Sequence, residues 1–130
     1  MVRIIREIAR PMLAGVFIAG GMDVLSNPEP RAQMAKPVVD KVARAVPIAP
    51  KDPVTAVSVN ALVHIGAGGL LAAGIVPRLA SLALAVSIVP TTLASHPFWD
   101  IEDPVQRARQ RTQFLKNTAI LGGLLVVALD

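Results

Sequence analysis

The residues best suited to chemistry gather in one short motif, His96-Pro97-Phe98-Trp99-Asp100. An imidazole beside an indole suits hydrogen bonding to a quinone carbonyl or a polar lipid head, and the Trp99 ring offers a stacking face. The alternative is an aromatic anchor at a membrane interface with a turn-forming proline, because tryptophan prefers that interface. Residue spacing alone favours the anchor.

Asp23 and Lys116 form the sharpest charged pair in the sequence. Each lies about one turn inside an apolar segment, where an unpaired charge costs several kcal/mol. We therefore expect the two side chains to pair. The pair would be a structural link that sets the register of two helices, or else part of a proton-binding or ligand-binding site.

His64 lies about halfway along a long apolar run, and Asn60 lies one helical turn before it. The chain has 2 His residues, which are distant in sequence, and it has no HxxxH or ExxH motif. The histidines are therefore only a weak signal for a metal or haem site. We expect this pair of buried polar side chains to make hydrogen bonds between helices. A proton relay or a metal ligand is the alternative for His64.

The acidic residues Asp100, Glu102 and Asp103 form a possible cation site. Three arginines follow them directly, at positions 107, 109 and 111. Local charge balance is therefore the simpler explanation of this cluster, and we expect no metal site here.

The composition narrows the class of protein that holds these residues. The chain has 130 residues, 53% hydrophobic and 17% charged, with a net charge of +4 and no Cys. Average soluble domains carry about 25% charged residues, so an integral membrane protein is expected. The absence of Cys excludes thiolate chemistry, and 3% aromatic residues argue against nucleic-acid binding. The motifs GxSxG, GxGxxG and the Walker loop are missing.

Long apolar runs predict an all-α, four-helix membrane bundle that forms a single domain over residues 1–130. We expect the first span to be retained rather than cleaved as a signal peptide. The residues between the first two spans contain six prolines, which predicts a loop with one short amphipathic helix at Pro37–Val46, in the headgroup plane or packed on the bundle. Two pairs of small residues, Gly15 with Ala19 and Gly69 with Ala73, predict close helix contacts. The predicted spans are about 4–25, 54–76, 79–95 and 112–129, with an interfacial segment at 26–53.

Four crossings place both termini on one side of the membrane, here called side A, and both long connections on the other, here called side B. Side B carries eight basic residues against four on side A. The positive-inside rule therefore favours side B as the cytoplasmic face and the termini as outside. Asp23, Lys116 and the His96 motif all converge on side B.

Several of these segments resemble the DoxX family of small bacterial membrane proteins. The resemblance rests on His96-Pro-Phe-Trp-Asp100, on Gln113-Phe-Leu-Lys-Asn117 followed by Gly122-Gly-Leu-Leu, and on Gly20-Gly-Met-Asp-Val-Leu25. The family often has a lysine after the charged position of this last segment, whereas Val24 stands here. The residues matched to family motifs are Asp23, His96, Pro97, Phe98, Trp99, Asp100, Lys116 and Asn117.

The resemblance implies a bacterial plasma-membrane protein linked to redox enzymes. The family is associated with subunits of a terminal quinol oxidase and of thiosulfate:quinone oxidoreductase. Mycobacterial relatives are described as the membrane component of an oxidoreductase complex that acts in oxidative-stress defence. We therefore expect a non-catalytic membrane subunit without a cofactor or an activity of its own. We expect it to contact lipids and protein partners, and homo-oligomerisation is a further possibility. The alternative is a quinone- or lipid-binding unit with its site among Asp23, His96, Trp99 and Lys116, and a small transporter or channel is a distant third.

Overall fold

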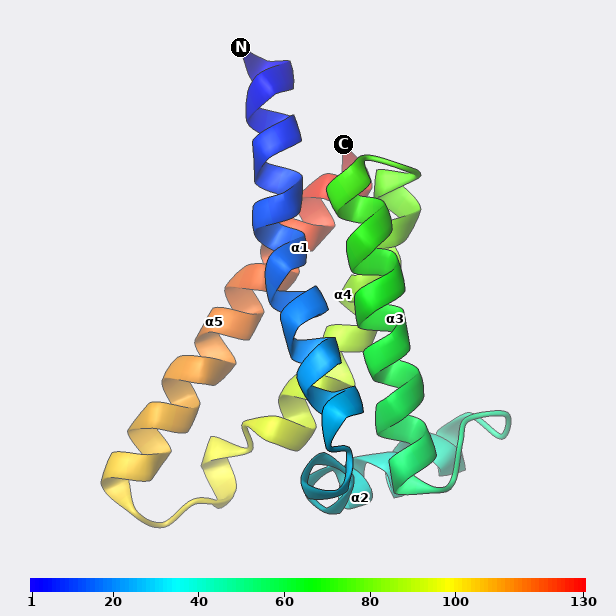
Figure 1. Ribbon diagram of the computed structural model, residues 1–130. Coiled ribbons are helices and arrows are strands. Elements are labelled where there is room, and N and C mark those ends of the chain that lie inside the picture. Colours follow the sequence, from blue (N-terminus) through cyan, green and yellow to red (C-terminus); the bar gives the residue numbers. More distant parts are fainter.

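The protein is an all-helical bundle, described here from a computed structural model of residues 1–130 (Figure 1). Its four long helices are α1 (Val2–Ser26), α3 (Pro53–Ala73), α4 (Pro77–Ser95) and α5 (Pro104–Leu129). These four helices are long and apolar enough to cross a membrane. Both termini lie at the same end of the bundle (Figure 1). The predicted all-α fold with four apolar spans is therefore confirmed.

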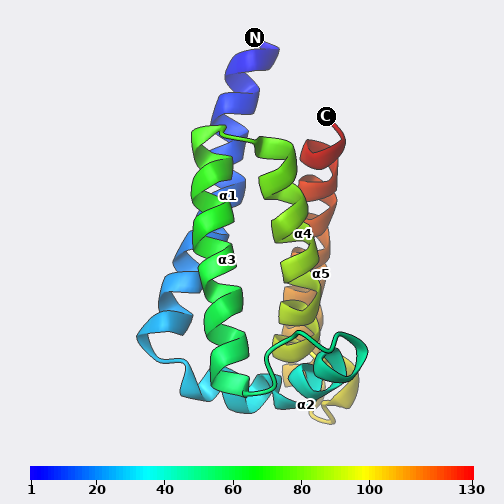
Figure 2. The same cartoon turned by 90° about the vertical axis from the view of Figure 1, so that its right-hand side faces the viewer.

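The opposite end of the bundle, side B, holds the remaining helices. They are α2 (Glu29–Ala45) and the short 3-10 helix η1 (Phe98–Asp100). Figure 2 shows α2 running across the lower ends of the spans rather than along them. Ala35 and Val39 of α2 pack against Ala94 near the end of α4. The helix thus covers the side B end of the bundle with its small apolar face and turns Lys36, Lys41 and Arg44 outward.

The prolines of the first connection do not limit its helix to the range predicted from the sequence. The prediction was a short helix at Pro37–Val46, but α2 begins eight residues earlier. Pro28 precedes the helix and Pro30 stands in its first turn, where a missing N–H loses no hydrogen bond. Pro37 is inside the helix and frees the carbonyl of Gln33, which lies on the exposed face and can be solvated there.

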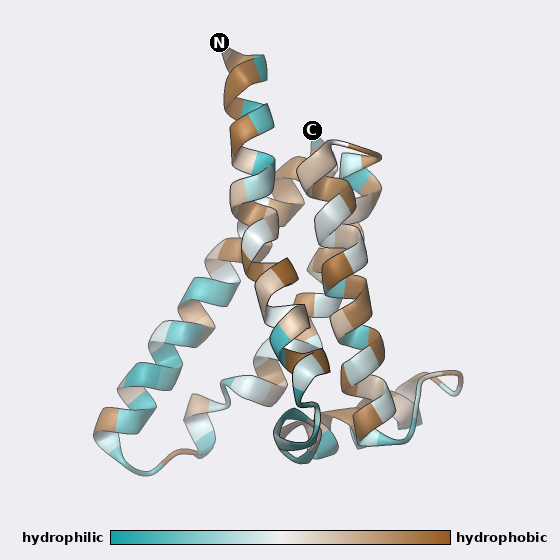
Figure 3. Ribbon diagram, in the orientation of Figure 1, coloured by the Kyte–Doolittle hydropathy of each residue, from teal (hydrophilic) through white to brown (hydrophobic).

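The fourth span also begins earlier than its apolar residues indicate. The sequence predicted a start near Thr112, but α5 begins at Pro104. Asp103 accepts a hydrogen bond from the Gln106 amide at 3.1 Å and so caps the helix. The first two turns are polar, and Figure 3 shows them as the hydrophilic lower half of α5. Here α5 leans away from the other helices (Figure 1).

The start of α3 is fixed by a charged cap. The Asp52 carboxylate accepts hydrogen bonds from the backbone N–H of Thr55 at 3.0 Å and from its hydroxyl at 2.9 Å. These bonds, the backbone one first, lower the pKa of Asp52 below its ordinary value. At its other end α3 stops at Gly74, whose φ of 72° is in the left-handed region that glycine adopts without strain.

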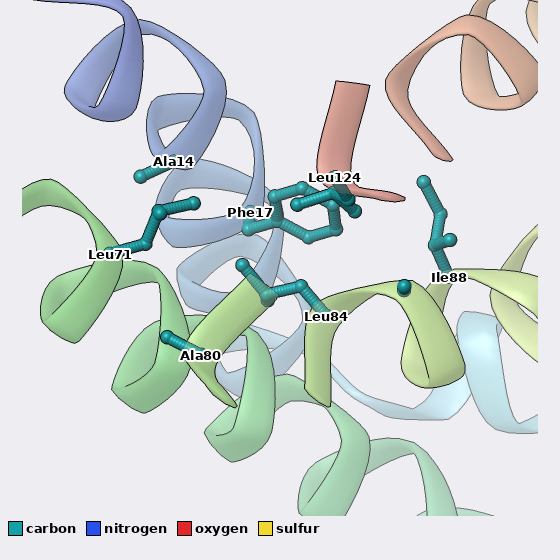
Figure 4. Packing of buried hydrophobic residues seen from close by; sticks show 8 residues of the cluster. Ala14, Phe17, Leu71, Ala80, Leu84, Ile88 and Leu124 are labelled. Carbon is teal, nitrogen blue, oxygen red and sulfur yellow. The ribbon is translucent and has the colours of Figure 1, made fainter. Parts of the chain in front are cut away.

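The core lies in the half of the bundle nearer side A. Its buried residues come from all four long helices, with Phe17, Leu71, Leu84 and Leu124 as the larger members (Figure 4). Leu124 is the one buried residue of α5. At the side A end, the Asp130 side chain pairs with Arg6 at 3.0 Å and its main-chain oxygen accepts a hydrogen bond from Arg78. The spans are thus tightly joined towards side A.

The closest helix contact, between α1 and α3, uses glycines other than those predicted. Gly15 and Gly69 have no neighbouring atoms near the position of a Cβ, and both face outward. Instead, a Cβ on Gly21 would lie 2.7 Å from the Ala61 carbonyl oxygen, and one on Gly68 would lie 3.0 Å from Ile18. The buried face of α1 follows Ala14, Phe17 and Gly21, so the predicted pairs fall on the other side of each helix.

Candidate functional site

A cavity of about 740 Å³ lies between α1, α3 and α4, and α2 covers its side B end. This volume is within the range of small-molecule sites, about 300–1,000 Å³. Twenty of its 30 lining residues are hydrophobic, and the lining includes Asn117 and Ile120 of α5. The cavity therefore suits a largely apolar molecule that meets a few polar groups.

The polar residues of the wall form a ladder between α3 and α4. On α4 they repeat every four residues, at Ser87, Thr91 and Ser95, so they share one helix face. On α3 they are Asn60 and His64, also four residues apart. We call these five residues the polar ladder. It runs from the side B end of the cavity towards the middle of the membrane-spanning region.

Hydrogen bonds connect the middle of the ladder. The Asn60 amide nitrogen donates to the Thr91 hydroxyl at 2.7 Å, and the Ser87 hydroxyl donates to the Asn60 carbonyl oxygen. The Thr91 hydroxyl in turn donates to the main-chain oxygen of Ser87 at 2.9 Å. These contacts set the antiparallel register of α3 and α4. They place His64 about one turn deeper than Asn60.

His64 is the ladder residue farthest from side B, and one of its ring nitrogens has no hydrogen-bond partner. The residue is 8% exposed, and its buried Nε2 has no partner. Its ring meets that of Phe17 edge to face, with centroids 5.1 Å apart. An unpaired buried polar atom costs about 1–3 kcal/mol. A bound molecule with a hydroxyl or carbonyl group at this depth would remove that cost.

The cavity opens sideways between α3 and α4. Its outer rim consists of apolar side chains that are exposed on the bundle surface, at Val59, Val63, Leu82 and Val86. In a membrane these positions face hydrocarbon, since they lie on the spanning helices. A lipophilic molecule therefore reaches the ladder from the bilayer without passing through water.

The side B end of the cavity is different, because it is formed by α2. Val38, Val39 and Val42 contribute apolar surface, and Arg31 contributes a guanidinium group. Arg31 and His64 are the two titratable residues of the lining. The cavity thus has one cationic side chain, Arg31, at its side B end and one imidazole, His64, near the middle of the bundle.

Three residues highlighted in the sequence analysis line this cavity: Asn60, His64 and Asn117. Asn117 also donates a hydrogen bond to the Thr92 hydroxyl at 3.0 Å, which joins α5 to α4. The remaining candidate residues lie outside the cavity. They are Asp23, His96, Pro97, Phe98, Trp99, Asp100 and Lys116.

The His96 motif instead connects α4 to α5. His96 Nδ1 lies 2.6 Å from the Gln110 Oε1 atom. Phe98, Trp99 and Phe114 form an aromatic cluster with edge-to-face contacts, their centroids 5.3–5.8 Å apart. Such a cluster stabilises the turn into α5.

Asp23 and Lys116 do not form the predicted ion pair. Both side chains are exposed, and the three ion pairs of the chain are Arg3–Glu7, Arg6–Asp130 and Lys36–Asp40. The reason is the direction of the helices: α1 packs on α3, whereas α5 leans away from α1 towards side B (Figure 1). No group of three His, Cys, Asp or Glu residues lies close enough to bind a metal ion.

The sequence analysis missed the α4 side of the ladder. Its signal was present in the sequence as three of the five hydroxyl residues of α4, at a spacing of four in a largely apolar helix. Serine and threonine are common in membrane helices because their hydroxyls bond the carbonyl one turn earlier. The spacing of these hydroxyl residues therefore indicates a site only once the structure shows that they share the cavity wall with Asn60 and His64 of α3.

Comparison with known proteins places the chain in a family. The family model named DoxX matches residues 6–97. This stretch contains the whole polar ladder and ends at Pro97, so Phe98, Trp99, Asp100, Lys116 and Asn117 lie beyond it. Searches of curated proteins and of solved structures gave no match. The match confirms the resemblance noted in the sequence: this multi-pass membrane protein belongs to the DoxX family.

Proposed function

We propose that this protein binds a lipophilic molecule with a polar group, in the cavity between α1, α3 and α4. The observation that carries the proposal is His64, a buried imidazole with an unpartnered nitrogen that lines a cavity of about 740 Å³. Sites for small molecules combine an apolar wall with a few convergent polar groups. The polar ladder supplies those groups here.

On this proposal the ligand lies along the polar ladder. Its hydroxyl or carbonyl group bonds to His64, within reach of the Asn60 amide. Its apolar part leaves between α3 and α4, past Val63 and Val86, into the bilayer. A ring with carbonyl groups and an aliphatic tail, as in a quinone, fits this description, and so does a lipid with a small uncharged head.

The test is extraction of the tagged protein in native lipid, followed by mass spectrometry of the bound small molecules. We expect His64→Leu to retain about five- to tenfold less ligand, which corresponds to the loss of one hydrogen bond of about 1 kcal/mol. Trp99→Ala is the matched control, because Trp99 lies outside the cavity. Equal loss in both variants, or loss in Trp99→Ala alone, would move the site back to the His96 motif.

A second candidate function is a non-catalytic subunit or scaffold of a membrane-associated oxidoreductase complex in oxidative-stress defence. What favours it is the exposed basic surface of side B, formed by Lys41 and Arg44 of α2 and by the first turns of α5. Charged surfaces of this kind steer and orient protein partners. On this proposal side B faces the cytoplasm of a bacterium, from its plasma membrane, in line with the positive-inside rule.

Charge reversal tests the second candidate. Lys41→Glu combined with Arg44→Glu should reduce the recovery of co-purifying proteins, whereas Arg3→Glu on side A should leave it unchanged. Unchanged recovery in the α2 variant would rule out this surface as the contact. The outcome is independent of ligand retention, so the two candidates are separable.

A further inference from the structure

We propose that the protein forms a two-fold symmetric dimer in the membrane, in which Asp23 of each copy pairs with Lys116 of the other. This inference does not rest on the proposed ligand site, because it concerns the outer surface of the bundle. It rests on two unpaired opposite charges, on their shared depth and on their place on the facing sides of α1 and α5.

Asp23 and Lys116 are charges without a partner in their own chain. Asp23 lies on α1 and Lys116 on α5, and both are exposed on helices long and apolar enough to span a membrane. Neither belongs to one of the three ion pairs of the chain. Ionisable side chains within membrane spans are costly when unpaired and generally pair with one another. Each of these two side chains is therefore free to pair with a group outside the chain.

The two charges lie at nearly the same depth. Three contacts connect the helices at this level, namely Gly21 with Ala61, Asn60 with Thr91, and Thr92 with Asn117. Asp23 lies two residues beyond the first of these contacts, and Lys116 is next to the last. Their separation along the bundle axis is therefore within about one helical turn of 5.4 Å, which a lysine side chain spans. A two-fold axis along the membrane normal keeps every residue at its depth, so it can bring these charges together.

Both charges lie on the facing sides of α1 and α5. Lys116 shares a helix face with Gly123, and a Cβ on Gly123 would lie 3.8 Å from a methyl group of Leu13 on α1. Asp23 shares a helix face with Val16, which lines the same cavity as two residues of α5. Towards side B α5 leans away from α1 (Figure 1), so the facing sides separate at the level of the two charges.

The contacts of α5 with α4 keep Lys116 away from α1 of its own chain. Asn117, next to Lys116, donates a hydrogen bond to the Thr92 hydroxyl at 3.0 Å. Nearer side B, Gln110 Oε1 lies 2.6 Å from His96 Nδ1. These two contacts hold α5 on α4 on both sides of Lys116 along the helix, so the intramolecular pair cannot form without breaking them.

A second copy of the chain fits this surface, because the surface carries both charges. An isologous dimer repeats each contact twice, so two identical ion pairs satisfy the charges of both copies. A partner that offers a single charge would leave one of the two side chains unpaired. The residues one turn from the charges, Ala19 on α1 and Thr112 on α5, are small and exposed, which lets helices approach closely. In the dimer α1 of one copy thus lies alongside α5 of the other.

The chain has no Cys, so engineered cysteines report this contact without background. Two copies with different tags, one with Asp23→Cys and one with Lys116→Cys, are co-expressed, so that the second ion pair of the dimer stays intact. Native membranes are then treated with a short bifunctional methanethiosulfonate, because an Asp–Lys pair separates the two Cα atoms by more than the about 4.4–6.8 Å of a disulfide. The matched control combines Met22→Cys with Leu115→Cys, since these residues are exposed at the same depths but lie on other helix faces.

We expect the Asp23→Cys and Lys116→Cys copies to give about fivefold more cross-linked dimer than the control pair, because a short linker joins only residues that face each other. Either variant expressed alone should cross-link as weakly as the control. Equal yields in all combinations would overturn the dimer. A cross-link to a different protein in place of the second copy would overturn it as well.

Charge reversal tests the ion pairs themselves. Asp23→Lys places like charges opposite each other and should reduce the dimer fraction in native lipid by about tenfold or more. The double variant Asp23→Lys with Lys116→Asp restores opposite charges and should recover the dimer, whereas Lys41→Asp on α2 is a control that should leave it unchanged. A single reversal without effect, or a loss that the double variant does not reverse, would contradict the pairing. The readout is the oligomeric state, so its failure leaves the proposed ligand site to be judged by ligand retention.

Discussion

His64 occupies a buried position that an apolar side chain of similar size would fill at lower free energy. Its Nε2 has no partner, and the cost of that atom is about 1–3 kcal/mol. We predict that His64→Leu stabilises the ligand-free protein by about this amount while it weakens ligand retention. Unfolding by denaturant in lipid–detergent micelles measures the first effect. A loss of stability would mean that the imidazole has a structural partner.

Asn60 makes the hydrogen bonds that hold α3 to α4. Interhelical hydrogen bonds in membranes contribute about 0.6 kcal/mol on average and up to about 1.7. A double-mutant cycle with Asn60→Ala and Ser87→Ala should therefore give a coupling energy in this range. The pair Asn60 and Ser58 serves as the control, because Ser58 forms no hydrogen bond with Asn60. Zero coupling between Asn60 and Ser87 would show that the ladder is not connected.

At the scale of the helices, the contact between α1 and α3 depends on one glycine of an adjacent pair. A Cβ on Gly21 would lie 2.7 Å from the Ala61 carbonyl oxygen, whereas one on Gly20 would meet nothing within 4 Å. We predict that Gly21→Ala lowers the free energy of unfolding by about 1–3 kcal/mol, as overpacking does. Gly20→Ala should be neutral or slightly stabilising. Equal effects of the two substitutions would contradict the described contact.

The start of α3 should depend on pH through Asp52. Its pKa is lowered by hydrogen bonds from Thr55, so the folded state holds the carboxylate form. The stabilisation is present above the unfolded pKa of about 3.9 and is lost as the pH falls through the lower folded pKa. The protection factor of the Thr55 amide, which corrects for the intrinsic pH dependence of hydrogen exchange, should fall over that acidic range. Asp52→Asn keeps a capping side chain and should remove the pH dependence; a remaining dependence would point to another carboxyl group.

The helices show how far sequence reasoning extends. Apolar runs with few charges identified the four spans because a membrane helix must be apolar over most of its length. The starts of α2 and α5 were missed because both helices begin with polar turns. These starts are stabilised by the Asp103 cap on α5 and by Pro30 in the first turn of α2, and neither follows from hydropathy.

The site shows the limit more clearly. Asn60 and His64 were identified from their polarity within an apolar run, but their surroundings depend on which faces of α1, α3 and α4 meet. The sequence placed the candidate site around Asp23, His96, Trp99 and Lys116 because all four lie near side B. Sharing a side of the membrane does not place residues in one cavity, and the direction of α5 separates Lys116 from Asp23.

At the scale of the whole molecule, the bundle is asymmetric along its axis. Towards side A the spans share a buried core, whereas towards side B α5 leans away from the other spans (Figure 1) and α2 packs across their ends (Figure 2). The buried core stabilises the fold. The cavity leaves room for a bound molecule. This division fits a protein whose function is to bind a lipophilic molecule.

Native mass spectrometry of the protein released directly from membranes tests this central claim most directly. We predict one lipophilic molecule bound per chain in the wild type. Ala83→Phe, which fills the cavity from α4, should remove it, and Ala119→Phe, on the exposed face of α5, should leave it in place. A chain without bound ligand, or one that keeps its ligand equally in both variants, would contradict the proposed function.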